Sequence, residues 1–282
     1  MPVRIVQSKQ NARLKELRRA LAGPWHDKAR EGAREPGAVA GIEGPNLIAE
    51  ALRAGLRIES VFVADQSVRL LEGLSLTPEI EVLLLPRELL ASALTTETPQ
   101  PIAALVERPQ WSWEQVLQAK AAPLILIVAG LQDPGNLGTI LRSAEAFGAT
   151  GVVSLPGTVS AWNPKAVRAS AGSVFRVPLL AAGVEECFAR LHAAKIPVWT
   201  TAVEDAKEAP RLSLAGPVAV IIGNEGSGVA AEIAEQADGA LTIPCPGPVE
   251  SLNAAVAASV LLYEASRQRA ASPQPRRAGR GR

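Results

Sequence analysis

The sequence predicts an α/β protein of two domains, the second of which is built on a largely parallel sheet. In the second half, short apolar runs such as LILIVAG and VAVIIG alternate with stretches of helical spacing. That alternation is typical of parallel strands covered by helices on both faces. The 282 residues exceed a typical domain of roughly 100–200 residues. A hydrophobic share of 48% against 20% charged residues suits ordinary packed cores.

Residues 1–110 are expected to form the first domain, a small α/β unit. Leu14, Leu17 and Leu21 are spaced three and four apart, which predicts a helix near the start. Residues 26–41 have the polarity and glycine content of a loop or a strand edge. A second helix is expected over 43–56, with Asn46 as its cap and Gly55 as its stop. Strands are expected at 58–64 and 81–86, residues 95–109 close the unit, and residues 111–122 form a linker with a short helix.

Residues 123–268 are expected to form the second domain. Its predicted strands lie at 124–130, 151–155, 197–203, 218–223 and 241–244. Its predicted helices lie at 136–148, 164–175, 230–238 and 252–269. Ligands on such sheets bind at the carboxyl ends of the strands. Residues 269–282 are rich in Pro, Gly and Arg without an apolar partner, so a basic disordered tail is expected.

The net charge of +1 hides two basic ends. Such ends suit a polyanionic partner such as RNA, because each neutralised phosphate releases counterions. A solvated helix face and a free tail explain the same charges. The basic residues are Arg4, Lys9, Arg13, Lys15, Arg18 and Arg19 at the start, and Arg267, Arg269, Arg276, Arg277, Arg280 and Arg282 at the end.

Several classes of protein are disfavoured by what the sequence lacks. Cys187 and Cys245 have no spacing typical of a disulfide framework or a zinc site, so no metal is expected. No phosphate-binding GxxxxGK[ST] loop and no GxGxxG behind a strand are present. His26 and His192 flank no nucleophile motif. The start has no secretory signal and no apolar run approaches the roughly 20 residues of a membrane span, so a cytoplasmic protein is expected.

Three segments join a strand end to a glycine-rich or polar loop that leads towards a helix. They are residues 131–149, 221–229 and 241–264. In the first, Pro134 and Gly135 favour a loop placement for Asn136, which would then cap the helix while Arg142 projects from its second turn. The second, GNEGSG, would on its own be read as a tight turn.

Together the three segments resemble the SpoU (TrmH) family of RNA 2′-O-methyltransferases, within the SPOUT superfamily. The first family motif corresponds to Asn136 and Arg142 followed by AEAFGA, and the second, G-x-E-x-x-G, to Gly223, Glu225 and Gly228. The third corresponds to Ile243, Pro244, Glu250, Ser251, Leu252 and Asn253. The resemblance covers about residues 123–268. Upstream, ETPQPIAALV resembles part of the family's substrate-recognition domain, although Pro101 stands where members usually have glycine.

The resemblance implies a SPOUT-type parallel sheet with a deep trefoil knot and a bent S-adenosylmethionine held by backbone groups of the three loops. It implies cofactor contacts from Gly223, Asn224, Ile243, Pro244 and Leu252, with Thr200 as a further candidate. It also assigns Arg142 to the activation of a ribose 2′-hydroxyl, with Asn136, Glu225, Ser251 and Asn253 arranging the site. Because a guanidinium stays protonated, we expect Arg142 to bind a phosphate and stabilise the developing alkoxide rather than act as a base.

Simpler roles exist for each of these residues. Arg142 could pair with Glu145 or Glu225, Glu225 could be a turn residue, and Ser251 or Asn253 could cap a helix. We expect methylation of rRNA or tRNA, with rRNA favoured. The alternatives are an RNA- or ribosome-binding protein of the same fold without activity, and a nucleotide-dependent dehydrogenase that lacks its phosphate motif. We also expect a homodimer through the closing helix, on a face formed by Leu252, Val256, Val260 and Tyr263.

Overall fold

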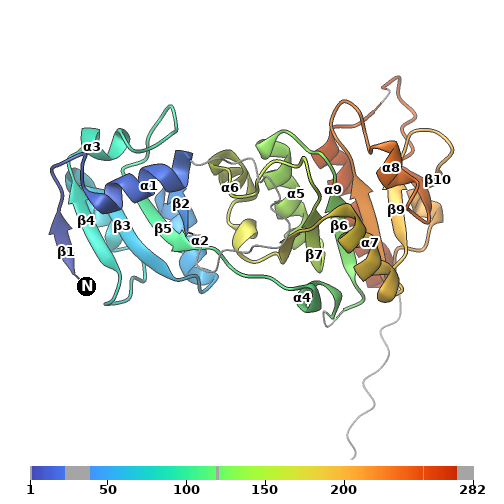
Figure 1. Cartoon of the computed structure of the whole chain (residues 1–282), viewed down its shortest axis with the longest axis horizontal. Helices are drawn as coiled ribbons and strands as arrows, with labels where there is room; N and C mark the ends of the chain where they lie inside the picture. The colour runs from blue at the N-terminus through green and yellow to red at the C-terminus, as the bar shows by residue number, and fades with distance from the viewer. Residues whose placement is uncertain (1, 23–38, 119–120, 250, 272–282) are drawn as a thin grey trace, which may run out of the picture.

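Two sheets lie side by side along the long axis of the molecule (Figure 1). The structure, a computed structural model, describes residues 2–22, 39–118, 121–249 and 251–271. The predicted α/β architecture is confirmed, with one sheet in each half of the chain. Most of the loop expected at 26–41 and most of the tail expected beyond residue 268 lie outside the described residues. Within the described part of the chain, no helix is long and apolar enough to cross a bilayer.

The N-terminal sheet has the strand order β1-β4-β3-β5-β2. β1, β4 and β3 run parallel, whereas β5 is antiparallel to both β3 and β2. The strands are β1 (Val3–Ile5), β2 (Val39–Glu43), β3 (Ile58–Ala64), β4 (Glu81–Leu85) and β5 (Ile102–Glu107). Helices α1 (Ala12–Ala22) and α3 (Arg87–Ala91) pack on one face and α2 (Pro45–Arg53) on the other, while η1 (Asp65–Leu71) connects β3 to β4. The three leucines that predicted α1 are buried.

The cap expected for α2 was wrong. Gly44 occupies the N-cap position with φ of 98° and Pro45 begins the helix, so Asn46 lies inside the first turn. Proline favours the first helical position because its missing N–H has no partner there and its fixed φ suits a helix. The stop expected at Gly55 is confirmed: α2 ends at Arg53, and Gly55 two residues later adopts a left-handed φ of 72°.

The C-terminal sheet has seven strands in the order β10-β12-β9-β11-β6-β7-β8, and all neighbours are parallel. The strands are β6 (Leu124–Val128), β7 (Gly151–Ser154), β8 (Leu179–Ala181), β9 (Val198–Thr201), β10 (Lys207–Glu208), β11 (Val218–Ile222) and β12 (Gly239–Thr242). The largely parallel sheet expected in this half is therefore confirmed.

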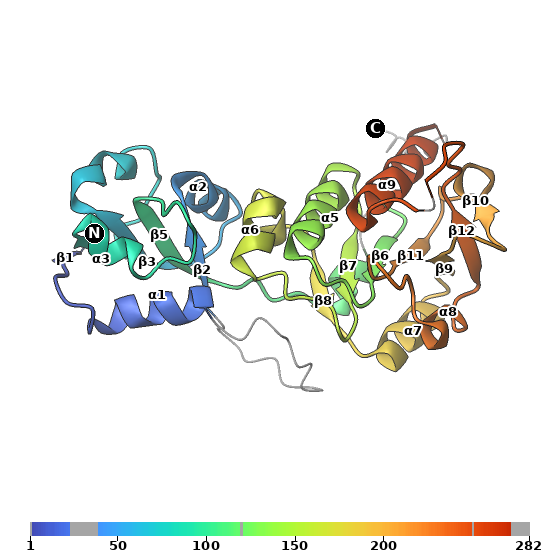
Figure 2. The same cartoon turned by 90° about the horizontal axis from the view of Figure 1, so that it is seen from above.

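Helices cover both faces of this sheet (Figure 2). Both faces need cover because β6 and β11 are apolar at every position. Alternate residues point to opposite faces of a strand. Leu124 and Leu126 pack with α5 (Pro134–Ala146), α6 (Pro164–Ser170) and α9 (Ala254–Ala271). Ile125 and Ile127 pack with α4 (Trp113–Leu117), α7 (Val184–Ala193) and α8 (Ala231–Ala234). The short helices η2 (Ser173–Phe175) and η3 (Ala209–Arg211) complete the domain.

Two helix ends differ from expectation. The helix expected over 164–175 stops at Ser170, because Ala171 and Gly172 adopt left-handed φ of 50° and 91°. The last helix, expected over 252–269, runs from Ala254 to Ala271 and so passes the expected domain end at 268.

Arg269, which was expected in the free basic tail, is bound to the backbone of the domain. Its guanidinium donates to the carbonyls of Leu214 (3.1 Å), Pro123 (3.0 Å), Gly216 (2.6 Å) and Ala122. This side chain fastens the end of α9 to the start of the domain and to the loop before β11.

Candidate active site

The three polar segments singled out in the sequence follow strands that lie near one another in the sheet. β6 precedes residues 129–133, its neighbour β11 precedes 223–229, and β12 precedes 243–253. β9 lies between β11 and β12. Since the carboxyl ends of parallel strands share one edge, the three loops meet at the edge where ligands bind in such sheets.

The first loop ends in a capped helix. Asp133 is the N-cap of α5, accepting from the backbone N–H of Gly135 at 2.9 Å, and Pro134 is the first helical residue. Asn136 therefore lies in the first turn and not in the preceding loop, so its expected capping role was wrong. Asp is a favoured N-cap and proline a favoured first helical residue, and together they outweigh the turn tendency of Pro134-Gly135.

Glu225 ties the second loop to the first. Its carboxylate accepts from the backbone N–H groups of Gln132 (3.3 Å) and Asp133 (3.1 Å) and from the side-chain amide of Asn136 (3.0 Å). Partial burial opposes ionisation, but the hydrogen bonds from Asn136 and from the backbone outweigh it and hold the pKa of Glu225 below its ordinary value. Because Glu225 is ionised at neutral pH, its carboxylate is better suited to orienting Asn136 than to donating a proton in catalysis.

Asn224 shapes the second loop from within. Its side-chain oxygen accepts from the N–H groups of Gly226 (2.9 Å) and Ser227 (3.1 Å), and its side-chain amide donates to the carbonyl of Gly130 (2.8 Å). A Cβ on Gly223 would lie 2.2 Å from the backbone of Gly228, so only glycine fits there.

Asn253 joins the third segment to the first. Its amide donates to the side-chain oxygen of Asn136 at 3.1 Å, and its own oxygen accepts from the N–H groups of Ala255 (2.9 Å) and Val256 (3.3 Å) at the start of α9. Asn253 therefore caps α9 and also contacts the candidate site. Ser251 is exposed beside it, and Glu250 lies outside the described residues.

Arg142 is an exposed cation on α5 with no ion pair or hydrogen bond to another described residue. Neither pairing considered for it is found. Glu145 binds Arg176 instead, and Glu225 binds Asn136. The guanidinium of Arg142 is thus available to a phosphate or another anion.

The features around the second and third loops fit a ligand such as S-adenosylmethionine. Thr200, at the end of β9 between β11 and β12, has a buried hydroxyl with no hydrogen-bond partner among the described residues. Within the described part of the chain, the backbone of residues 244–249 makes no hydrogen bond. Ile243 is half-buried, Pro244 is exposed and Leu252 is half-buried. Gly223 lets two backbone segments approach closely, which suits a site made by main-chain groups.

Two residues near the site were not singled out from the sequence. Lys165, at the start of α6, donates to Asp133 at 2.6 Å. The hydrogen bond from Lys165, followed by that from the N–H of Gly135, holds the pKa of Asp133 below its ordinary value. The Asp-Pro pair could have revealed Asp133 as a cap, whereas nothing in the sequence marks Lys165. Among the described residues, no cluster of three or more His, Cys, Asp or Glu side chains could hold a metal ion.

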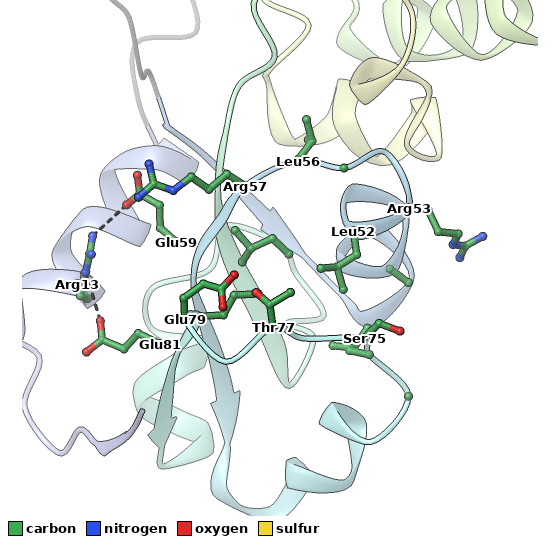
Figure 3. A pocket seen from close by; sticks show the side chains of 16 residues that line it. Arg13, Leu52, Arg53, Leu56, Arg57, Glu59, Ser75, Thr77, Glu79 and Glu81 are labelled. Carbon is green, nitrogen blue, oxygen red and sulfur yellow. Dashed lines mark hydrogen bonds and ion pairs between the residues drawn. The ribbon is translucent and has the colours of Figure 1, made fainter. Parts of the chain in front are cut away.

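A hollow of about 1080 Å³ on the N-terminal domain lies apart from the three loops (Figure 3). It is formed by the end of α2, the start of β3 and residues 73–81. Arg13, expected among the phosphate-binding residues, is bound there by Glu59 (3.1 Å) and Glu81 (3.5 Å) and also by Glu16. The hydrogen bond to Glu16 contributes most to raising the pKa of Arg13. Because acids already neutralise Arg13, this part of the basic start of the chain is a poor phosphate site.

Two family models match the chain. Residues 123–263 match the SpoU rRNA methylase family, and residues 42–112 match the RNA 2′-O ribose methyltransferase substrate-binding family. The 23S rRNA (guanosine(2553)-2′-O)-methyltransferase RlmP of Bacillus subtilis is 35% identical over 222 residues, which is 79% of this chain and 86% of that protein. The 23S rRNA (guanosine-2′-O-)-methyltransferase RlmB of Xanthomonas campestris is 40% identical over 154 residues, 54% of this chain and 61% of that protein.

Solved structures resemble the whole described fold. The SpoU methyltransferase AviRb of Streptomyces viridochromogenes, in complex with its cofactor AdoMet, aligns with a TM-score of 0.80 at 26% identity. The alignment covers 94% of this chain and 100% of that one. An AdoMet-bound rRNA methyltransferase of Sinorhizobium meliloti aligns with a TM-score of 0.78 at 27% identity, covering 94% and 98% of the two chains.

Proposed function

This chain belongs to the SpoU rRNA methylase family, and we propose that its substrate is a guanosine ribose in large-subunit ribosomal RNA. It is an RNA 2′-O-methyltransferase that uses S-adenosylmethionine as its methyl donor. The choice of guanosine and of 23S rRNA is supported by the names of the relatives from Bacillus subtilis and Xanthomonas campestris.

One observation in the structure supports catalytic activity at this site. A chain of hydrogen bonds runs from Asn253 through Asn136 to Glu225, joining all three motif segments, and the unpaired Arg142 lies on the same helix as Asn136. A protein that only bound RNA would have no need for this arrangement. The arrangement favours an active enzyme over an RNA- or ribosome-binding protein of the same fold without activity.

The cofactor would be held by the second and third loops, by Gly223, Asn224, Ile243, Pro244 and Leu252, with Thr200 beneath. Its main-chain contacts would come from the unbonded backbone of residues 244–249. The family resemblance also supports the deep trefoil knot expected for the second domain. Two contacts agree with such a path: Asn253 reaches Asn136 in the first turn of α5, and Arg269 at the end of α9 reaches residues 122–123.

S-adenosylmethionine, when bound, would supply a methyl group whose bond to the positively charged sulfur breaks as the ribose oxygen bonds to the methyl carbon, with the neutral thioether as leaving group. The chain must therefore align the ribose 2′-oxygen and stabilise the negative charge that develops on it. Arg142 binds the phosphate next to the target ribose and stabilises that charge, while the proton leaves to solvent or to the phosphate. The site around the ribose is arranged by Asn136, Glu225 and Asn253, which are joined by hydrogen bonds, and by the exposed hydroxyl of Ser251.

The active form is a homodimer that joins through α9. Val256, Val260 and Tyr263 are 49%, 40% and 55% exposed and follow one another at helical spacing. The ring of Tyr263 meets Phe147 edge-on at 5.8 Å, which widens the apolar face. A monomer by light scattering at micromolar concentration would contradict the dimer. We place the enzyme in the cytoplasm, because the named relatives are bacterial rRNA methyltransferases and bacterial ribosomes assemble there.

The experiment that tests the function uses ribosomal RNA from a strain that lacks the gene. The full chain is incubated with this RNA, or with transfer RNA, and S-adenosylmethionine carrying a labelled methyl group. One new 2′-O-methylguanosine is expected in 23S rRNA. Label in transfer RNA alone would overturn the proposed substrate, and no label in either RNA would overturn the activity.

A further inference from the structure

The two domains meet where α2 and β2 of the first domain lie beside α6 of the second (Figure 2). The approach is close: a Cβ on Gly172 would lie 2.7 Å from the Cβ of Glu50. Buried apolar residues form one continuous cluster that includes Ile48 of α2 and Phe175 of η2. The domains therefore share packing and are not joined by the linker alone.

Arg176 lies at this junction and its side chain contacts both domains. Its Nε and Nη2 donate to the two carboxylate oxygens of Glu145 on α5, at 2.5 and 3.0 Å. Its Nη1 donates to Glu50 on α2 at 2.6 Å. Two parallel bonds between a guanidinium and a carboxylate fix both distance and angle, which a single charge cannot do.

The three side chains are partly shielded from water, with exposed fractions of 33% for Arg176, 23% for Glu50 and 33% for Glu145. Without the guanidinium, the carboxylates of Glu50 and Glu145 would face each other across the domain junction with nothing positive between them. Arg53 pairs with Glu50 at 2.9 Å but has no contact with Glu145. The loss of Arg176 would therefore loosen the junction.

The linker is docked near the same place. The guanidinium of Arg108 lies 5.4 Å from the ring centre of Trp162, and Trp162 stacks on Phe175, the residue before Arg176. The indole N–H of Trp113 donates to Glu186 at 2.9 Å. These contacts hold residues 108–113, which follow β5, against the second domain.

Glu145 is one helical turn from Arg142 on α5. A helix transmits position along its length with little bending, so whatever fixes Glu145 against α2 also fixes Arg142 against the first domain. RNA that is bound to the first domain would then reach Arg142 at a set distance.

We propose that Arg176 is a positioning residue that sets the span between the RNA-binding domain and Arg142, and thereby which nucleotide is methylated. This inference rests on the proposed function. A misplacement on the order of 1 Å at a reacting centre can lower the rate by roughly 10²-fold, so a modest loosening of the junction is enough to change selectivity.

The test compares Arg176→Gln with Arg211→Gln, a matched control that removes an Arg–Glu ion pair (2.9 Å to Glu208) away from the junction. Each full-length variant methylates ribosomal RNA from a strain without the gene, and all 2′-O-methyl positions are mapped. For Arg176→Gln we expect unchanged affinity for S-adenosylmethionine by calorimetry and little change in KM for RNA. We expect kcat at the wild-type nucleotide to fall on the order of tenfold or more, with new methylation at neighbouring nucleotides. The control should resemble the wild type.

A second variant, Glu50→Gln, removes the negative charge that holds Arg176 to the first domain and leaves Arg176 bound to Glu145; it also removes the charge partner of Arg53, which lies within the first domain. It should shift the methylated positions in the same way, and the double variant should be no worse than Arg176→Gln. Wild-type selectivity in Glu50→Gln, or a loss of cofactor affinity in Arg176→Gln with unchanged positions, would overturn the proposal. If the wild-type enzyme methylates no ribose at all, the proposed function fails instead.

Discussion

The side-chain amide of Asn253 donates to the side-chain oxygen of Asn136 at 3.1 Å, although 117 residues separate them in the chain. The same Asn253 caps α9. One side chain therefore couples the start of the last helix to the start of α5, on which Arg142 lies.

Replacement of Asn253 by alanine should lower both stability and cofactor affinity. Loss of an N-cap costs about 0.5–2 kcal/mol, and the third loop would also lose its link to Asn136. Ser112→Ala, which removes the capping box of α4 away from the three loops, is the control. We expect both variants to unfold at lower denaturant concentration but only Asn253→Ala to bind S-adenosylmethionine more weakly in calorimetry. Equal cofactor affinity in the two variants would contradict this role.

Glu225 should stabilise the fold in a pH-dependent way. Because its pKa lies below the ordinary value of 4.5, its carboxylate stabilises the folded chain above about pH 4.5. That contribution is lost as the pH falls below this value and through the folded-state pKa. Glu225→Gln should therefore be less stable than the wild type at pH 7, and the gap should close towards pH 3 in urea titrations. The exposed Glu232→Gln should show no such gap, and a gap in Glu225→Gln that stays constant with pH would refute the assignment.

Alkylation of Cys245 should report on the third loop, and the buried Cys187 serves as an internal comparison. Burial, with a smaller effect of Glu186, raises the pKa of the Cys187 thiol to about 12, so it should resist alkylation in the folded protein. Cys245 is exposed and lies next to Pro244, so iodoacetamide should modify it and bound S-adenosylmethionine should slow the modification. Mass spectrometry of the intact chain and of Cys245→Ser distinguishes the two sites. Equal alkylation with and without cofactor would count against cofactor binding at this loop.

Much of the fold could be predicted because its strongest signals are local. β6 and β11 are apolar runs bounded by turn residues, and the structure has strands at both of them. Helix α7 was not expected, and the caps of α2 and α5 were misassigned. In both misassigned helices a proline takes the first position, which moves the asparagine inside the helix. Proline's fixed geometry was the deciding signal.

The candidate site could be predicted only as three loops, since its contacts join residues far apart in the chain. The hydrogen bond of Asn136 to Glu225 spans 89 residues. At the domain junction, the hydrogen bond of Arg176 to Glu50 spans 126 residues. Nothing in the sequence indicates that Glu145 would bind Arg176 and leave Arg142 unpaired. That choice is made by the packing of α5 against η2, which brings Arg176 beside Glu145. The catalytic roles given to Arg142, Asn136, Glu225, Ser251 and Asn253 remain predictions.

The most direct test of the account is Arg142→Ala, with methyl transfer and cofactor affinity measured on the same preparation. If Arg142 binds phosphate and stabilises the developing alkoxide, kcat should fall by about 10²–10³, the scale for loss of one preorganised donor, with an unchanged Kd for S-adenosylmethionine. Arg142→Lys should recover only part of the rate, because an ammonium lacks the planar fork of guanidinium. Arg190→Ala, which removes another exposed helix arginine, should behave as the wild type. Near-normal turnover by a well-folded Arg142→Ala variant would contradict the assignment of this catalytic centre.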